Sequence, residues 1–482
     1  MRTLIDVDPG EIRARVAHYV DDGWRLAHLV GRDLEFATEL IYVFLRHHDG
    51  RHECRVRLSG PSPSIPSIAE LSFSGGRLER LVRDQLGVEF LQHPEPRALL
   101  RHGHWPKDVF PLRAGPLRLE VSDDAEPYPF LTVPGPGVYE IPVGPVHAGL
   151  IEPGHFRFSV VGETILHMSA RLWFVHRGLE RLAAGRSTEE VLRLAEVVSG
   201  DSAVAHSLAY LLALEDATGV TVSPEVTARR QGLLELERVT HHVADLGALA
   251  NDVGYSVAHA RAMRLVESLQ RLAQEITGHR LLRGALSVGG AQWNYEPPAS
   301  LFPSLSGEVS SLAEWILRHP VVRDRFELTA MLSHEDAARV GVLGPVARAS
   351  GLKTDARVEH PLGLEMPLRT QETGDVRARF DQRVKEALDS LDVLSRLVAG
   401  ERPQARGSDG AATGEGLGVV EGWRGAVVHR VALHEGRVSR WAPIDPSFFN
   451  WPALAVSLAD TIVPDFPLVN KSFNLSYAGN DL

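Results

Sequence analysis

The stretch LLELERVTHHVADLGALANDVG, residues 233–254, decides the class of fold, because its apolar residues recur with the period of an α-helix. The residues on its apolar side are Leu233, Leu236, Val239, Val243 and Leu246. An unbroken apolar side is typical of a helix that packs against a core. Similar patterns extend over residues 171–280, and a further helix pair fits 308–400. The sequence therefore predicts a mainly helical domain with buried helices.

Strands are predicted on both sides of this helical region. Residues 155–174 are typical of two strands with a turn near Gly162 and Glu163, and residues 418–443 return to strands before an irregular terminus. The Gly/Ala/Ser-rich stretch 397–418 predicts a mobile loop. These features together indicate an α+β protein.

The N-terminal third has its own pattern of elements. Residues 11–45 are interpreted as a helix followed by a strand, and a second strand over 51–60 follows the turn sequence HHDG, so we expect a hairpin. An amphipathic helix is predicted with Leu78, Leu81, Val82 and Leu86 on one side. The Pro- and Gly-rich stretch 123–145 then indicates a linker between domains.

Composition excludes several classes of function. The chain has 482 residues, which predicts two or three domains, and its 44% apolar and 23% charged residues are ordinary for a globular protein. A net charge of −11, with no run of Lys and Arg longer than two, argues against nucleic-acid binding. We expect neither a transmembrane helix nor a secretory signal. The single cysteine, Cys54, can form no internal disulfide and cannot hold an iron–sulfur cluster, so a redox centre has to come from a partner.

The first candidate site lies in AEVVSGDSAVAHSLAY, residues 195–210, which is interpreted as one helix. Ser199 and Ser202 are three residues apart and would share a face, with His206 one turn further. Two ligands and a histidine in this spacing suit a metal site, but the side chains are hydroxyls. The C-terminal sequence repeats the spacing with Ser476 and Gly479, flanked by Asn474 and Tyr477.

Other polar residues are weaker candidates. His147, Glu152 and His155 could form a cluster for proton transfer or metal binding, although polar groups at a sheet edge are the favoured interpretation. Adjacent His241 and His242 point in different directions on a helix, and we expect one surface and one core histidine. Arg424 lies in EGWRGAVVH and could reach a buried site or lie in a surface turn. The Gly-x-Gly sequences at 135–137 and 414–418 lack the context of a phosphate loop.

Several motifs resemble those of one family. They are VGPVHAGLIEPGHFRFSVVGE, FVHRGLERL, EGWRGAVVH, DPSFFNWPAL and DFPLVNKSFNLSYAGNDL. Together they resemble the large subunit of group 4 energy-converting nickel–iron hydrogenases and its relative, the 49-kDa subunit of complex I. RLVRDQLGVEFLQHPEPRALL resembles the complex I 30-kDa subunit. The chain thus resembles a fused 30-kDa/49-kDa subunit, as in formate hydrogenlyase, with a 30-kDa-like domain at 1–122, a linker at 123–136 and a 49-kDa-like domain at 137–482.

The resemblance also locates the family's metal site. Hydrogenases of this family hold nickel and iron with two C-x-x-C pairs, which align with Ser199 and Ser202 and with Ser476 and Gly479. Serine is not appreciably ionised near neutral pH, and such metals select soft thiolates, so we expect no nickel–iron centre. The complex I tyrosine that contacts quinone aligns with Gly200, and a second loop histidine with Ile151. The resemblance therefore does not imply a standard quinone headgroup site.

By the same resemblance, Glu152, His155, His147, His206 and Arg424 are the expected catalytic residues. Ser199, Ser202, Ser476 and Asn474 would line a vestigial pocket that the C-terminal segment covers. The implied function is that of a core subunit of a redox complex peripheral to the cytoplasmic side of the membrane. The implied partners are an iron–sulfur small subunit, a ferredoxin-like subunit and a membrane arm with antiporter-like subunits, with quinone as a possible acceptor. A catalytically silent structural subunit and a hydrogenase with an altered metal site are the alternatives.

Overall fold

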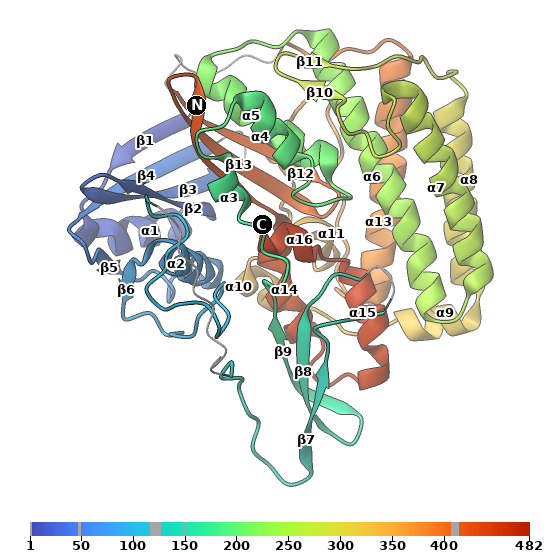
Figure 1. Ribbon diagram of the computed structural model, residues 1–482. Coiled ribbons are helices and arrows are strands. Elements are labelled where there is room, and N and C mark those ends of the chain that lie inside the picture. Colours follow the sequence, from blue (N-terminus) through green and yellow to red (C-terminus); the bar gives the residue numbers. More distant parts are fainter. Residues whose placement is uncertain (1, 47–49, 116–126, 149–150, 406–413) are drawn as a thin grey trace.

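An α/β unit forms the N-terminal part of this computed structural model, which describes residues 2–46, 50–115, 127–148, 151–405 and 414–482 (Figure 1). Its four-stranded sheet has the order β1-β4-β3-β2, in which β1 is parallel to β4 and the other pairs are antiparallel. The strands are β1 (Arg2–Asp6), β2 (Arg25–Leu34), β3 (Ala37–Arg46) and β4 (Gly50–Ser59). The remaining elements of the unit are η1 (Pro9–Glu11), α1 (Ile12–Asp21), α2 (Phe73–Leu86) and the parallel pair β5 (Ser64–Pro66) and β6 (Glu89–Leu91).

The predicted hairpin is confirmed as β3 and β4. The interpretation of residues 11–45 as one helix and one strand is wrong, because β2 precedes β3 and pairs with it. The central part of β2 is buried on both faces, so it lacks the alternation of apolar and polar residues that identifies a half-buried strand. The predicted amphipathic helix is confirmed as α2, whose Leu78, Leu81, Val82 and Leu86 are all buried.

A three-stranded antiparallel sheet extends from the lower side of the molecule in Figure 1. It consists of β7 (Val138–Val143), β8 (His155–Val161) and β9 (Thr164–Arg171). The two strands predicted after residue 155 and the turn at Gly162 are confirmed. The linker predicted over residues 123–145 is wrong for its last part, because β7 pairs with β8 along its length. Pairing with β8 stabilises β7 as a strand despite the turn-forming composition of its sequence.

The main helical part follows β9. Its long helices are α6 (Pro224–Asp252), α7 (Ser256–Thr277), α8 (Leu301–Arg318) and α13 (Val376–Val398), which stand side by side at the right of Figure 1. The five residues predicted on the apolar side of α6 are fully buried. The shorter elements are α3 (Leu179–Ala183), α4 (Thr188–Ala195), α5 (Ala203–Thr218), β10 (Leu286–Ser287), β11 (Gly290–Ala291), α9 (Pro320–Phe326), α10 (His334–Val340), α11 (Gly344–Ala349) and α12 (Ala356–Glu359).

A C-terminal sheet of β12 (Glu415–Gly422), β13 (Gly425–His434) and β14 (Arg437–Ile444) packs on α5 (Figure 1). A Cβ atom on Gly416 or Gly418 would lie 1.9 Å from a carbonyl oxygen of α5. These glycines therefore let the strand backbone touch the helix backbone. The predicted loop 397–418 is wrong at both ends, because α13 and β12 extend into it, and its residues 406–413 lie outside the described residues. The chain ends with α14 (Pro446–Ser457), η2 (Val463–Asp465), α15 (Phe466–Phe473) and α16 (Tyr477–Asp481).

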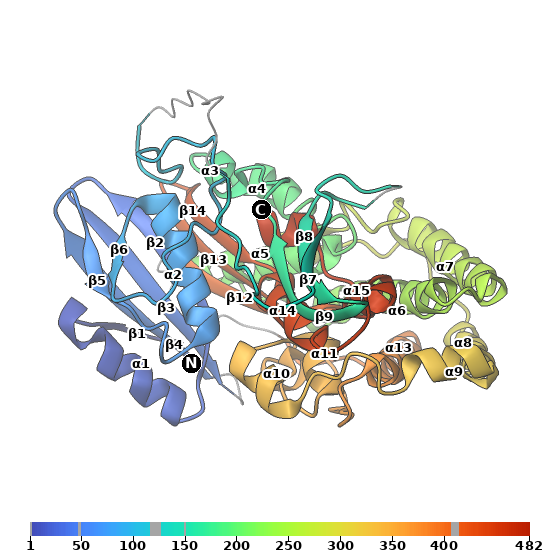
Figure 2. The same cartoon turned by 90° about the horizontal axis from the view of Figure 1, so that it is seen from below.

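The C-terminal sheet also joins the N-terminal unit to the rest of the molecule, as the view in Figure 2 shows. Arg440 of β14 donates to the carbonyl oxygen of Gly31 in β2 over 2.9 Å. Arg430 of β13 lies 3.2 Å from the carboxylate of Glu53 in β4. The predicted α+β class is confirmed, with an α/β unit before a mainly helical part with small sheets. None of the helices in the described ranges is long and apolar enough to cross a bilayer.

Candidate functional site

The serine pair at 199 and 202 lies in a turn between two helices. Helix α4 ends at Ala195 and α5 begins at Ala203, so the single helix predicted over 195–210 is wrong. Ser199 and Ser202 are both buried, and Ser202 occupies the residue before α5. Short polar side chains compete with the backbone for hydrogen bonds and therefore disfavour a helix. Three of the four residues at 199–202 are of this kind, which explains why the chain forms a turn here.

A directed chain of hydrogen bonds connects this turn to the C-terminus. The Ser199 hydroxyl donates to Oδ1 of Asp201 over 2.8 Å and lies 2.8 Å from the Ser476 hydroxyl. A hydroxyl has one proton, so Ser476 is the donor in the bond between the serines. Ser476 Oγ in turn accepts the backbone N–H of Gly479 over 2.9 Å at the start of α16. The two predicted halves of the site therefore meet, 277 residues apart in sequence.

Arg424 closes the site from the turn between β12 and β13. Its two terminal nitrogens each donate to one carboxylate oxygen of Asp201 over 2.6 Å, and its Nε donates to the carbonyl oxygen of Asn474 over 2.5 Å. The guanidinium carbon lies 3.9 Å from the ring centre of Trp423. Burial by itself raises the pKa of Asp201, but the charge and hydrogen bonds of Arg424 outweigh it and hold the pKa below its ordinary value. The pair is therefore ionised and fixed in a bidentate geometry.

A second chain of hydrogen bonds passes behind the site. The Trp441 indole donates to Nδ1 of His429 over 3.1 Å, so the His429 proton is on Nε2. His429 Nε2 lies 3.0 Å from Nδ1 of His206, and His206 Nε2 lies 3.0 Å from Oδ2 of Asp445. Because an indole only donates, His429 is neutral, and each imidazole accepts at Nδ1 and donates from Nε2 in the direction of Asp445. Burial lowers the pKa of His429 well below its ordinary value, in agreement with this neutral form.

A nickel–iron centre does not fit these residues. Ser199 and Ser476 oxygens 2.8 Å apart leave no space between them for two metal ions. A Cβ atom on Gly479 would lie 2.8 Å from Oδ2 of Asp445 and 3.0 Å from Ser476 Oγ, so a thiol-bearing side chain has no space at that position. Elsewhere in the described ranges, no three His, Cys, Asp or Glu side chains gather as metal ligands. The donor set consists of hard hydroxyls and has none of the thiolates that soft metals need.

The predicted cluster of His147, Glu152 and His155 does not form. His147 Nε2 donates to the carbonyl oxygen of Gly154 over 2.8 Å, and His155 Nδ1 bonds another backbone carbonyl of the same loop over 3.2 Å. Glu152 instead accepts the backbone N–H of Ala478, in the first turn of α16, over 2.9 Å. The three side chains therefore have separate partners, and only Glu152 contacts the C-terminal segment that carries Ser476.

Sequence reasoning missed several residues of the site. Asp201, between the two serines, is the partner of Arg424, and no pattern in the sequence pairs the two. His241 stacks on Trp423 with 5.1 Å between ring centres, so it belongs to the wall of the site and is not a free surface histidine. The Asn474 side chain, expected to line the pocket, donates to Asp245 over 2.5 Å. The one available signal was that Asp201 is the only acid in the motif S-G-D-S.

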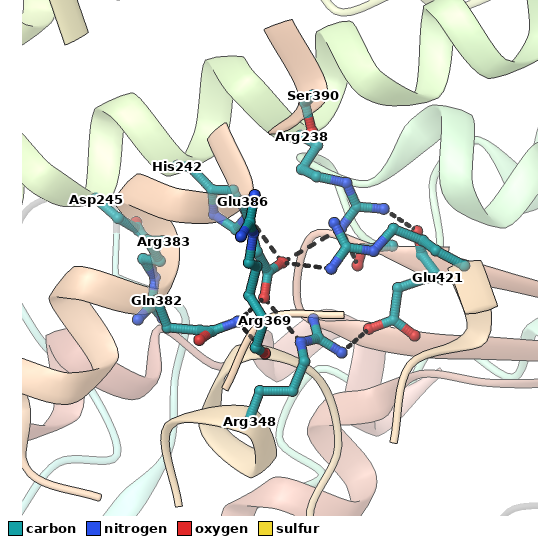
Figure 3. Close-up of polar contacts among 12 residues, drawn as sticks. Arg238, His242, Asp245, Arg348, Arg369, Gln382, Arg383, Glu386, Ser390 and Glu421 are labelled. Carbon is teal, nitrogen blue, oxygen red and sulfur yellow. Dashed lines mark hydrogen bonds and ion pairs between the residues drawn. The ribbon is translucent and has the colours of Figure 1, made fainter. Parts of the chain in front are cut away.

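From Asp245 a buried ionic network extends between α6, α13 and β12 (Figure 3). Arg383 donates to Asp245 over 2.8 Å, and one turn along α13 Glu386 accepts from Arg348 over 2.8 Å. Arg348 also donates to Glu421 over 2.8 Å. Of the two adjacent histidines, His242 is the expected core histidine, buried 3.5 Å from Glu386, but neither of its ring nitrogens has a hydrogen-bond partner among the described atoms. Burial raises the pKa of Glu386, but surrounding arginines outweigh it and hold the pKa well below the ordinary value.

Two family descriptions match this chain. The description "Respiratory-chain NADH dehydrogenase, 49 Kd subunit" matches residues 252–406, and the corresponding 30 Kd subunit matches residues 5–118. Among curated proteins, formate hydrogenlyase subunit 5 of Escherichia coli is 30% identical over 96% of this chain and 86% of its own length. The carbon monoxide-induced hydrogenase of Rhodospirillum rubrum is 30% identical over 70% of this chain and 97% of its own length.

More distant similarities agree with these. The membrane-bound hydrogenase alpha subunit of Pyrococcus furiosus is 28% identical over 70% of this chain and 85% of its own length. Among solved structures, one of the membrane-bound sulfane sulfur reductase, titled an archaeal respiratory membrane complex, matches with a TM-score of 0.64. That match covers 72% of this chain and 99% of the other at 21% identity, so it concerns the fold.

Proposed function

Since this chain belongs to the family of fused complex I 30-kDa/49-kDa subunits, which is related to the large subunits of formate hydrogenlyase and group 4 hydrogenases, we propose that it is the core subunit of a membrane-associated redox complex. In this proposal it packs on an iron–sulfur small subunit next to the serine site. A ferredoxin-like subunit delivers electrons, and a membrane arm with antiporter-like subunits couples their transfer to proton or ion translocation.

The observation that carries the proposal is the connected set Ser476, Ser199, Asp201 and Arg424. By the resemblance of the sequence, Ser199 and Ser476 align with positions where relatives of this family hold a nickel–iron centre, and here the set offers a fixed ion pair and oriented hydroxyls in place of thiolates. The charge of Arg424 is balanced by Asp201, so the site favours an acceptor whose reduction adds no net charge, with electrons and protons arriving together. A quinone is one such acceptor, since it takes up two electrons and two protons.

Glu152 and the histidine chain supply the groups for proton movement in this proposal. Glu152 is exposed on one side and contacts α16 on the other, so it connects solvent to the C-terminal segment. His206 lies behind the same segment, next to Asp445. Carboxylates and imidazoles within hydrogen-bond distance of each other are the usual proton-transfer groups of proteins.

The proposal is tested with Glu152→Gln and Arg424→Ala in the assembled complex. We expect co-purification with the iron–sulfur subunit to persist, while turnover falls by roughly a hundredfold, the low end of what a positioned proton-transfer group contributes. Glu163→Gln and Arg437→Ala are matched controls at exposed positions and should turn over normally.

Two results would replace this proposal with an alternative. Normal turnover of both site variants would favour a catalytically silent structural subunit, a role for which the closed ion pair at Arg424 is itself suited. Stoichiometric nickel in the purified complex, measured by elemental analysis, would favour a hydrogenase with an altered metal site.

A further inference from the structure

A cavity of about 410 Å³ is lined by residues of α2 in the N-terminal unit and of β9, α10 and α14 in the later part of the chain. We call it the arginine pocket. Its polar lining includes Arg77, Arg80, Arg97, Arg171 and Arg339, and the one acidic residue of its lining in the described ranges is Glu95. The pocket is far from charge-neutral, and its volume is within the range of sites for small organic ligands.

Three of these arginines have no carboxylate partner among the described residues. Arg97 is paired with Glu95 and Arg339 with Asp336, whereas Arg77, Arg80 and Arg171 form no ion pair there. Arg80 donates to the carbonyl oxygens of Arg97 and Ala98 over 3.1 and 3.2 Å. Arg171 donates to those of Leu99 and Arg101. Backbone carbonyls therefore fix these guanidinium groups without neutralising them.

The uncompensated charge is also shielded from water. The exposed fractions of Arg80 and Arg171 are 8% and 4%. Nε of Arg77 and Nε of Arg171 are buried and have no hydrogen-bond partner among the described atoms. Burial and the nearby charge of Arg80 lower the pKa of Arg77 to about 9. Unpaired buried charges are costly, and an anion in the cavity would offset this cost.

Aromatic rings hold the arginines in orientation. The Arg171 guanidinium lies 4.5 Å from the ring centre of Tyr128, and that of Arg77 lies 4.9 Å from Phe448 and 6.0 Å from Trp173. Trp173 also has a left-handed backbone with a φ of 66°, a strained conformation for a bulky residue. Cation–π contacts orient a guanidinium while leaving its charge available to a ligand.

We propose that the arginine pocket binds the phosphate group of a small phosphorylated ligand, with Arg77 and Arg171 as its principal contacts. Guanidinium groups match the geometry of a phosphate, and the terminal nitrogens of Arg77 and Arg171 carry N–H donors beyond those bonded to backbone carbonyls. The apolar walls near Trp173 accept the rest of the ligand. Because the pocket spans two parts of the chain, occupancy also stabilises their association.

The first experiment titrates the full-length chain with inorganic phosphate and with AMP by calorimetry, in a buffer free of other anions. We expect one site per chain. Arg77→Lys removes the planar fork and keeps the charge, and Arg171→Gln removes both. Each should weaken binding by about tenfold or more, as expected when a charge-assisted bidentate contact is lost. Arg271→Gln, at an exposed position of α7, is the matched control and should bind like the wild type.

A second experiment identifies the source of the phosphate. Flotation with vesicles of phosphatidylglycerol, compared with phosphatidylcholine, tests a lipid headgroup, whereas AMP tests a soluble nucleotide. Binding in either arm that Arg77→Lys weakens supports the pocket and assigns its ligand. The absence of binding of phosphate, AMP and vesicles overturns the proposal, as does binding that Arg77→Lys leaves unchanged. If Arg171→Gln does not fold, Arg77→Lys decides the test alone.

Discussion

At the scale of single residues, Gly479 determines how closely the C-terminus approaches Asp445. A Cβ atom at this position would lie 2.8 Å from Oδ2 of Asp445, closer than carbon and oxygen can approach without a shift. We expect Gly479→Ala to lower the free energy of unfolding by about 1–3 kcal/mol, the usual cost of overpacking. Chemical denaturation measures it. Gly307→Ala is the matched control, because nothing lies within 4 Å of its Cβ position in α8, and helix propensity makes it neutral or stabilising. Equal stability of the two variants would show that α16 does not pack tightly against Asp445.

Asp481 gives a pH dependence of stability at the same scale. Burial raises its pKa to about 6, above the value of about 3.9 for an unfolded chain. The folded state therefore holds this proton more tightly, and the stabilisation is complete below pH 4 and lost as the pH rises through 6. In the wild type, the free energy of unfolding should fall by about 3 kcal/mol between pH 4 and pH 6, and Asp481→Asn should abolish this fall. Denaturation curves measured between pH 4 and 6 test this, with exposed Asp324→Asn as the control. Identical slopes for Asp481→Asn and wild type would contradict it.

At the scale of elements, the ionic network of Figure 3 joins α6, α13 and β12. Glu386 is fully buried and lies within ion-pair distance of Arg348, Arg357 and Arg238. We expect Glu386→Gln to destabilise the protein by about 1–3 kcal/mol, because the surrounding arginines lose one charged acceptor although each keeps another buried acid. Thermal and chemical unfolding measure the loss. The exposed acid Glu267 of α7 is the control, since its i,i+4 pair with Arg271 contributes at most about 0.5 kcal/mol. A small effect at Glu386 would mean that water reaches the network.

At the scale of the whole molecule, the junction between the N-terminal unit and the C-terminal sheet depends on Arg430. It is 2% exposed and pairs with Glu53 over 3.2 Å and with Glu415 over 2.7 Å. We expect Arg430→Met to reduce stability by about 3 kcal/mol, as for other broken buried pairs. Hydrogen exchange of the β4 amides should accelerate while exchange in α6 stays unchanged. Arg32→Met removes a more exposed 3.4 Å contact to Glu415 and should have little effect. Uniform acceleration throughout the chain would show that the two parts unfold together.

Much of the fold was predictable because periodic burial is a local property. The apolar residues of α2 and α6 recur every three or four positions, and all those predicted to be buried are buried. The hairpin of β3 and β4 follows from β-branched and aromatic residues in β3, a partial alternation in β4 and a turn sequence between them. By contrast, the prolines and glycines in and around β7 indicated a linker. Its formation as a strand depends on pairing with β8, which follows it in sequence. The break before Ser202 was missed for a similar reason, since Asp201 of this turn forms its ion pair with distant Arg424.

The amino-acid sequence was enough to establish the family and the chemistry available at the site: four positions without thiolates, one cysteine in the chain, and a set of hydroxyls, amides and imidazoles. How these groups are used became visible only in the folded chain. Folding joins Ser199 to Ser476, pairs Asp201 with Arg424, separates His147 and His155 from Glu152, and gathers several arginines around one cavity. The reason is physical. Helical and strand periodicity depends on neighbours in sequence, whereas an ion pair or a hydrogen-bond chain depends on packing that brings together residues hundreds of positions apart.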